Sequence, residues 1–260
     1  YLRVALIRNN KILKYIKKKT PSEKNKLIQE LFNTISELTN ENKNITGIGI
    51  ASPGPLKDGI IKNPPNLPLQ NYNLKKEIQK KFKKRVEVEN DASCVALAES
   101  KLGCKRNNFI ILTLGTGIGG GIIINNELYL GQGYAGEFGH IILNNGEYFE
   151  NLAAWKKIKK ITKQKLGKET LIQDLIKSKN PKAKKILNEI TMYLGQGIAS
   201  LANAFDPEIV IISGGVRETG LPFLNMIKKQ AQKYNSLPKK VPISWTKLDH
   251  PGVLGASLLV

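Results

Sequence analysis

The segment Leu112–Gly121, LTLGTGIGGG, constrains the fold more than any other part of the chain. An apolar strand pattern, NFIILTL over residues 108–114, runs into a loop with five glycines in the seven positions 115–121. Glycine lets the backbone adopt positive φ and approach a ligand closely, so successive N–H groups can cradle phosphate oxygens. We expect a second strand, Ile122–Ile124, to follow. The loop is neither a Walker A sequence nor a dinucleotide fingerprint, because it lacks Gly-Lys-Ser/Thr and precedes a strand.

One glycine cluster fits a structural β-turn and a phosphate loop about equally well. A second strand, Glu208–Ile212, ends in Ser213-Gly214-Gly215. Two strands that both end in glycine turns favour a nucleotide held between two loops. The remaining pattern alternates strands and helices, which indicates the α/β class. The other expected elements are a hairpin (2–8 and 11–16, joined at Asn9-Asn10), strands at 44–51, 86–89 and 241–246, and helices from Thr20, over 74–82, over 91–102, across most of 150–205, and from about 252.

The segment Glu89-Asn90-Asp91-Ala92 lies at an expected junction between a strand and a helix. A carboxylate at such a junction can act as a general base toward a hydroxyl group. Asn and Asp are also common helix caps, and on this segment alone the cap is the better interpretation.

Two further segments carry polar groups suited to a ligand. Glu137 and His140, three residues apart around Gly139, can face one pocket. Residues 141–150 contain no Cys and no second His, which argues against a closed zinc site there. Asn66 lies in the proline-rich loop Asn63–Pro68, and its amide can donate to and accept from sugar hydroxyls.

The chain of 260 residues carries a net charge of +20, which invites a nucleic-acid interpretation. Five of its 41 basic residues are Arg, the residue preferred for phosphate and base recognition, and the other 36 are Lys. The lysines are dispersed over expected helix faces, so we interpret the charge as a solvated surface. No apolar run is long enough for a membrane span and no secretory signal is visible. With two cysteines, a cytoplasmic location is expected.

The ordered set of motifs resembles the ROK (repressor, open reading frame, kinase) family of sugar kinases, over nearly the whole chain. Ser52–Pro55 resembles the family's PGP turn, and Asn63–Pro68 its TPNLP loop. Glu89–Ala92, Leu114–Gly121 and Glu137–His140 resemble the NDA, GTGIGGG and ExGH motifs. The segment from Asp206 to Gly215 resembles DPxxIVIGGG.

The resemblance implies an actin-like, RNase-H-like ATPase fold with two lobes and a cleft between them. It implies ATP and Mg²⁺ as cofactors, a hexose as substrate, and phosphorylation of glucose to glucose 6-phosphate with Asp91 as general base. The implied substrate ligands are Asn66, Asn90, Glu137, His140 and Glu150. The implied nucleotide ligands are Gly115, Thr116, Gly117, Gly119, Gly120, Gly214 and Gly215.

The chain departs from the family pattern in two places that matter for function. The family's first DxGGT turn has no counterpart, because Tyr1–Leu6 resembles the strand after it. Either the sequence is incomplete or the protein has lost its first phosphate loop, and the start at Tyr1 without Met favours the first. The family's cysteine-rich zinc loop is reduced to Gly146–Glu150, so we expect no zinc and a His140 that contacts sugar alone. The shortened segment between His140 and Glu150 also leaves the identity of the sugar open.

We expect a small lobe over residues 1–106, with the C-terminal helix 252–260 packed on it, and a large lobe over 107–251. Relatives in this family form dimers or tetramers, so a homodimer or homotetramer is expected. The alternative function is a sugar-sensing ROK-type transcriptional regulator without catalysis. A lysine-rich nucleic-acid binder is a third, less favoured, possibility, and it would show steeply salt-dependent affinity.

Overall fold

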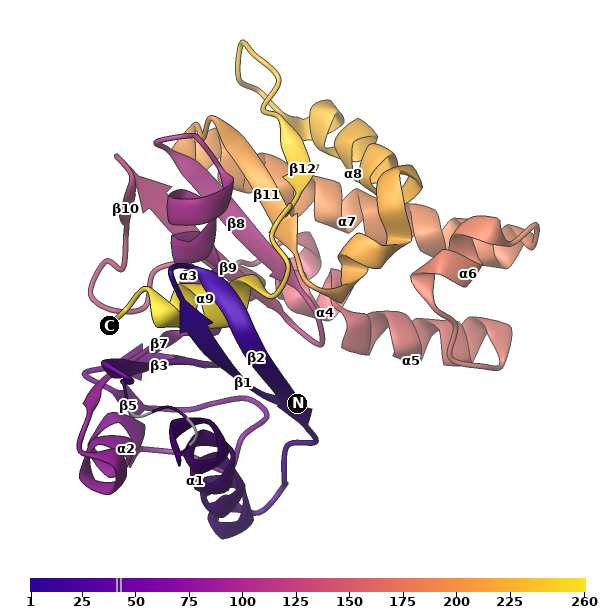
Figure 1. The fold of residues 1–260 in the computed structure, drawn as a ribbon. Coiled ribbons are helices and arrows are strands. Elements are labelled where there is room, and N and C mark those ends of the chain that lie inside the picture. Colours follow the sequence, from indigo (N-terminus) through magenta and orange to yellow (C-terminus); the bar gives the residue numbers. More distant parts are fainter. Residues whose placement is uncertain (41, 43) are drawn as a thin grey trace. The chain divides into compact units, whose positions relative to one another are not determined.

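The computed structural model describes residues 1–40, 42 and 44–260 (Figure 1). The contacts within the chain divide it into two units. Unit 1 consists of Tyr1–Cys104, Leu128–Ala135 and Leu248–Val260. Unit 2 consists of Lys105–Glu127 and Gly136–Lys247. No helix in the described part of the chain combines the length and the apolar composition needed to cross a bilayer.

The glycine-rich segment belongs to a five-stranded sheet in the order β10-β9-β8-β11-β12. Strand β8 pairs antiparallel with β9 and parallel with β11, which in turn pairs parallel with β12. The central strands are continuous apolar runs because both of their faces are buried. The strands are β8 (Phe109–Leu114), β9 (Ile118–Ile124), β10 (Glu127–Leu128), β11 (Ile209–Ser213) and β12 (Ile243–Trp245).

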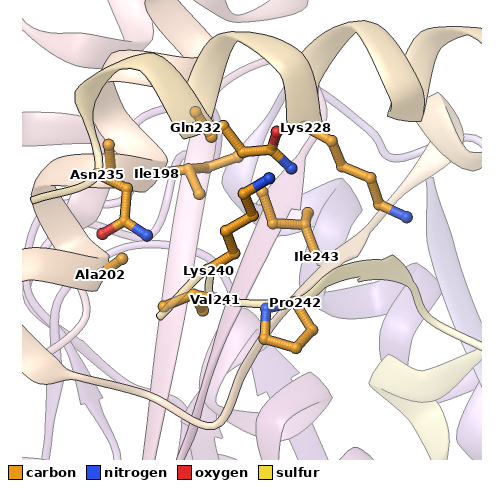
Figure 2. Close-up of a pocket in the computed structure, with 11 residues that line it drawn as sticks. Ile198, Ala202, Lys228, Gln232, Asn235, Lys240, Val241, Pro242 and Ile243 are labelled. Carbon is orange, nitrogen blue, oxygen red and sulfur yellow. The ribbon is translucent and has the colours of Figure 1, made fainter. Parts of the chain in front are cut away.

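Four α-helices of unit 2 lie between β10 and β11 in the sequence, and a fifth lies between β11 and β12. The longest, α7, runs alongside α8, which also contacts β12, and a pocket opens between the two helices (Figure 2). The helices are α4 (Phe149–Ala153), α5 (Trp155–Leu166), α6 (Ile172–Lys177), α7 (Pro181–Phe205) and α8 (Gly220–Tyr234). Short 3-10 turns cover Phe138–His140, Asn144–Gly146 and Gly215–Thr219.

Unit 1 starts with the expected hairpin, in which β1 (Leu2–Arg8) pairs antiparallel with β2 (Lys11–Lys18). Asn9 and Asn10 both have positive φ, 49° and 61°, as a two-residue type I′ turn requires. The hairpin prediction is therefore confirmed.

The other strands of unit 1 position the segment that contains Asp91. Strand β3 (Gly47–Ser52) pairs parallel with β7 (Arg85–Asn90), and the pairing ends with Ser52 opposite Asn90. Because parallel strands end at one edge, the turn after β3 lies beside the helix that follows β7. Three two-residue strands form a further small sheet: β4 (Leu56–Lys57), β5 (Ile60–Ile61) and β6 (Tyr72–Asn73).

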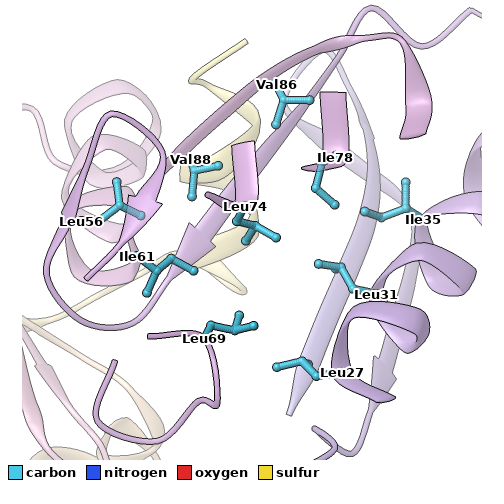
Figure 3. Packing of buried hydrophobic residues seen from close by; sticks show 10 residues of the cluster. All are labelled: Leu27, Leu31, Ile35, Leu56, Ile61, Leu69, Leu74, Ile78, Val86 and Val88. Atoms are coloured by element: carbon cyan, nitrogen blue, oxygen red, sulfur yellow. The ribbon is translucent and has the colours of Figure 1, made fainter. Parts of the chain in front are cut away.

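Ten buried aliphatic side chains form one core cluster of unit 1 (Figure 3). Helix α1 (Lys24–Asn40) contributes Leu27, Leu31 and Ile35 to this cluster, at the four-residue spacing of an amphipathic helix. Helix α1 begins at Lys24, so the expected start of this helix at Thr20 is wrong. The remaining helices are α2 (Leu74–Phe82), α3 (Asp91–Ala98), a π-helical turn (Glu99–Gly103) and α9 (Pro251–Ser257), which packs on α3 and β3.

Candidate functional site

Asp91 is the first residue of α3 and follows β7 directly. Its side chain is accessible to solvent, and its Oδ1 accepts a hydrogen bond of 2.9 Å from the Ala92 N–H. Protein atoms crowd around the carboxyl group, and this desolvation raises the pKa of Asp91, while backbone hydrogen bonds oppose the shift. An accessible carboxylate with a raised pKa is suited to accept a proton from a ligand.

Asn90, one residue earlier, is the helix cap. Its Oδ1 accepts from the N–H groups of Ala92 and Ser93, at 2.9 and 3.2 Å. Its Nδ2 donates to the carbonyl oxygen of Gly54 at 3.3 Å. The observed cap is therefore Asn90, and the role of the next residue, Asp91, as general base stays a prediction. The amide of Asn90 keeps one N–H for a ligand. Its assignment as a substrate ligand stays a prediction.

Asn66 lies on an exposed turn that belongs to the same neighbourhood of unit 1. A Cβ placed on Gly54 would lie 2.7 Å from the Cα of Pro64, so the turn after β3 packs tightly on the proline-rich loop. Gly54 thus contacts the loop of Asn66 on one side and the amide of Asn90 on the other. Unit 1 brings Asn66, Asn90 and Asp91 onto connected backbone segments.

Glu89 is a polar neighbour to which the sequence motif gave no role. It is half-buried, its Oε1 accepts from the Asn90 N–H at 2.7 Å, and desolvation raises its pKa. Burial also raises the pKa of the Cys94 thiol, and the carboxylates of Glu89 and Asp91 raise it further. Cys94 is therefore a packing residue rather than a nucleophile.

In unit 2, residues 115–117 form a tight turn between β8 and β9. The carbonyl oxygens of Gly115 and Thr116 accept from the first two N–H groups of α5, those of Trp155 (3.0 Å) and Lys156 (3.3 Å). In a trans peptide the N–H points opposite to the preceding C=O. The N–H groups of Thr116 and Gly117 therefore point away from α5, as a set of phosphate donors would.

The second glycine turn lies next to the first one, because Ser213 of β11 pairs with Thr113 of β8. Gly214 has φ 106° and ψ −179°, and a Cβ on it would collide with the carbonyl oxygen of Leu114. A Cβ on Gly115 or Gly215 would meet no heavy atom within 4 Å. The two turns thus touch through Gly214 and have open space above Gly115 and Gly215.

The expected loop over 115–121 is shorter than predicted, because β9 begins at Ile118 and not at Ile122. Gly119 and Gly120 lie within this strand. A Cβ on Gly120 would collide with the ring of Phe138, so the strand needs glycine there to admit that ring. The role of these two glycines as nucleotide ligands stays a prediction, whereas the packing role of Gly120 is observed.

Unit 2 also brings together the three other expected substrate ligands. His140 Nδ1 lies 3.5 Å from Glu137 Oε2, and His140 Nε2 lies 3.9 Å from Glu150 Oε1. Tyr148 presents its ring edge-on to the imidazole, with the ring centres 5.5 Å apart. Glu150 Oε2 also accepts from the Ile118 N–H at 3.4 Å, at the end of the glycine turn. Sequence reasoning gave no contact between Glu150 and this turn, because 32 residues separate them.

The residues after His140 do not fit the family's zinc site. No group of three or more His, Cys, Asp or Glu in the described residues is arranged to hold a metal. The segment is closed instead by backbone hydrogen bonds of 2.9 Å, from Leu143 N–H to Glu147 and from Phe149 N–H to Ile141. Phe149 is fully buried and anchors the end of this hairpin.

The family model described as ROK family matches residues 1–260. The chain belongs to the ROK family. It is 32% identical to the xylose repressor of Caldicellulosiruptor bescii, with 95% of this chain and 71% of that protein covered. It is 31% identical to the glucokinase of Halalkalibacterium halodurans, with 83% and 76% covered. The chain spans 57% of the length of the Bacillus subtilis xylose repressor.

Among solved structures, the chain is similar to a ROK family glucokinase from Streptomyces griseus in complex with glucose and AMPPNP. The TM-score is 0.86 at 25% identity, with 99% of this chain and 96% of that chain covered. The α/β class and the actin-like ATPase fold expected from the motifs are thereby confirmed.

Proposed function

We propose that this ROK chain is a sugar kinase, which transfers the γ-phosphoryl group of ATP to the primary hydroxyl of a hexose, with glucose as the first candidate. The observation that carries the proposal is the accessible carboxyl group of Asp91 at the start of α3. A regulator that only senses sugar has no need of a general base. The similarity to a glucokinase bound to glucose and AMPPNP supports the same function.

Asp91 accepts the proton of the sugar hydroxyl as its oxygen attacks the γ-phosphorus. The raised pKa of Asp91 makes its carboxylate a better proton acceptor than that of an ordinary aspartate. Asn90 fixes the start of α3 through its cap and so fixes the backbone that carries Asp91.

The paired glycine turns of unit 2 are the proposed nucleotide ligands. The N–H groups of Thr116 and Gly117 and the turn at Gly214-Gly215 would hold phosphate oxygens of ATP. The open space above Gly115 and Gly215 fits such a group. ATP would supply the phosphoryl group, and Mg²⁺ bound with it would neutralise charge on its oxygens. Catalysis by this protein is then chiefly positioning and charge stabilisation.

The hexose hydroxyls are assigned to Asn66, Asn90, Glu137, His140 and Glu150. Carboxylates accept from hydroxyls, and the amides and the imidazole can both donate and accept. His140 lies between two carboxylates, whose oxygens lie 3.5 and 3.9 Å from its two ring nitrogens. We expect the Tyr148 ring to restrict the same imidazole.

The test is sugar-dependent release of ADP with glucose, mannose, fructose and N-acetylmannosamine as acceptors. Asp91→Asn should lower kcat by about 10²–10⁴-fold, the usual contribution of a general base. Asp58→Asn is the matched control, because Asp58 is exposed on a turn with φ 53°, which Asn also adopts readily. Full activity in Asp91→Asn would refute the assignment.

The second candidate is a sugar-sensing regulator, which the 32% identity to a xylose repressor favours. Calorimetric binding of sugar with no ADP release from any sugar of the panel would select it. The proposal further includes a cytoplasmic location and a homodimer or homotetramer. Light scattering of the purified protein measures the oligomeric state.

A further inference from the structure

A pocket of about 310 Å³ opens in unit 2 between the C-terminal halves of α7 and α8 and the segment that leads into β12 (Figure 2). Its floor is apolar and well packed. Ile198, Ala199 and Ala202 of α7 and Ala231 of α8 are each at most 5% exposed, as is Ile243 of β12. A concave apolar floor with a few polar groups at its rim is the usual form of a small-molecule site.

The rim is cationic. Lys228 and Lys240 line the pocket, and none of its lining residues is acidic. Within the described part of the chain, no ion pair or hydrogen bond engages either ammonium group. Lys228 is half-buried, whereas its neighbour Lys229 is exposed. Lys240 is also exposed. Two cations without a counter-ion at the rim of an apolar floor favour an anion that also has an apolar part.

The pocket is separate from the glycine turns of the same sheet. The carbonyl oxygen of Pro242, in the pocket wall, accepts from the Val210 N–H near the start of β11. The turn at Gly214-Gly215 follows the other end of that strand. Four residue steps of extended chain, from Val210 to Gly214, separate these ends by about 13 Å. A ligand in the pocket therefore does not compete with one at the turns.

Three properties limit the ligand. Helices α7 and α8 both end beside the pocket, and their last carbonyl groups carry partial negative charge, which opposes any anion and opposes a doubly charged phosphate more strongly than a singly charged carboxylate. The Asn235 amide is already engaged, with the Lys239 carbonyl oxygen and the Leu237 N–H. One water molecule occupies about 30 Å³ in the liquid, so the pocket has room for roughly ten atoms of that size.

We propose that this pocket binds a monoanionic carboxylate with a compact apolar body, such as an arylalkanoate. In Figure 2 the Lys240 side chain extends toward Gln232 on α8, and Lys228 descends from α8 on the side of Ile243. The carboxylate is held at Lys240 and Gln232, Lys228 adds attraction, and the apolar body covers the floor.

The experiment is isothermal titration calorimetry of the full chain with 3-phenylpropionate and with its neutral analogue 3-phenylpropanamide. The acid should bind saturably and about ten-fold more tightly than the amide, because a charge-assisted hydrogen bond is lost with the amide. The double variant Lys228→Ala/Lys240→Ala should weaken the acid by about ten-fold. The double variant Lys229→Ala/Lys233→Ala removes the same charge from exposed positions of α8 and should leave binding unchanged.

Absence of saturable binding of the acid would overturn the proposal, and so would equal affinity for acid and amide. Equal losses in the two double variants would assign the binding to the overall charge of +20 and also overturn it. The titration contains neither ATP nor sugar, so its result is independent of the proposed kinase activity.

Discussion

The two adjacent glycines after β11 should respond oppositely to the same substitution. Gly214 adopts φ 106° and ψ −179°, a conformation almost confined to glycine, and a Cβ there would collide with the carbonyl oxygen of Leu114. The colliding atom belongs to the backbone at the end of β8 and cannot swing away. Gly215 lies outside the positive-φ region, and a Cβ there meets no atom within 4 Å.

The backbone strain at position 214 costs about 1–3 kcal/mol, and the forced shift of β8 adds a similar amount. We therefore expect Gly214→Ala to lose about 3 kcal/mol of unfolding free energy. For a chain of this size that loss lowers Tm by roughly 6–12 °C. Gly215→Ala should change Tm little, because it creates no clash and slightly restricts the unfolded chain.

In activity, by contrast, Gly215→Ala should show a clear effect, although it leaves Tm nearly unchanged. The new methyl group at position 215 enters the space assigned to the ATP phosphates. Loss of one charge-assisted hydrogen bond raises the KM for ATP by about ten-fold or more, with little effect on the KM for sugar. Calorimetric unfolding and ADP-release kinetics measure both effects. An unchanged Tm in Gly214→Ala would refute the contact between the turns, and an unchanged KM for ATP in Gly215→Ala would refute the phosphate assignment.

Two further outcomes follow from the carboxyl of Asp91 and from the hairpin 141–149. Because the folded state raises the pKa of Asp91, that residue favours folding at low pH and this contribution is lost as pH rises through the folded pKa. Asp91→Asn should therefore be more stable than the wild type at pH 7, and the difference should vanish below about pH 4, the pKa of an aspartate in the unfolded chain. Urea titrations at both pH values measure the difference in unfolding free energy. A less stable variant at pH 7 would contradict the desolvation of Asp91. Dialysis against 1,10-phenanthroline should leave Tm unchanged, because hydrogen bonds of 2.9 Å and the buried Phe149 ring close the hairpin; a fall of several degrees would show that a metal holds it.

Local patterns predicted those elements whose structure is decided locally. The Asn9-Asn10 hairpin and helix α2 follow from turn chemistry and amphipathic spacing, and α2 has the predicted bounds, Leu74–Phe82. Prediction was wrong where a tertiary contact decides. Three successive glycines read as a loop, yet β9 includes them because β8 pairs along its full length and Phe138 covers Gly120. The helix expected over 91–102 changes to a π-helical turn at Glu99.

The candidate site divides in the same way between local and distant determinants. Asn90 and Asp91 are neighbours, so their junction was visible in the sequence, although their division into cap and accessible carboxyl was not. The hydrogen bonds from Trp155 and Lys156 to the glycine turn had no sequence signature, because any residue except proline offers the same backbone N–H.

Glu150 lies between two parts of unit 2, the expected sugar ligand His140 and the glycine turn between β8 and β9. One carboxylate oxygen lies 3.9 Å from His140 Nε2, and the other accepts from the Ile118 N–H at 3.4 Å. A Cβ on Gly117 would come within 2.6 Å of that second oxygen, so the glycine turn and the carboxylate share one small volume. A shift of Glu150 would therefore disturb its hydrogen bond at the turn and change its distance from His140. We therefore expect a change in the length of the segment between His140 and Glu150 to alter the glycine turn as well as the surroundings of His140.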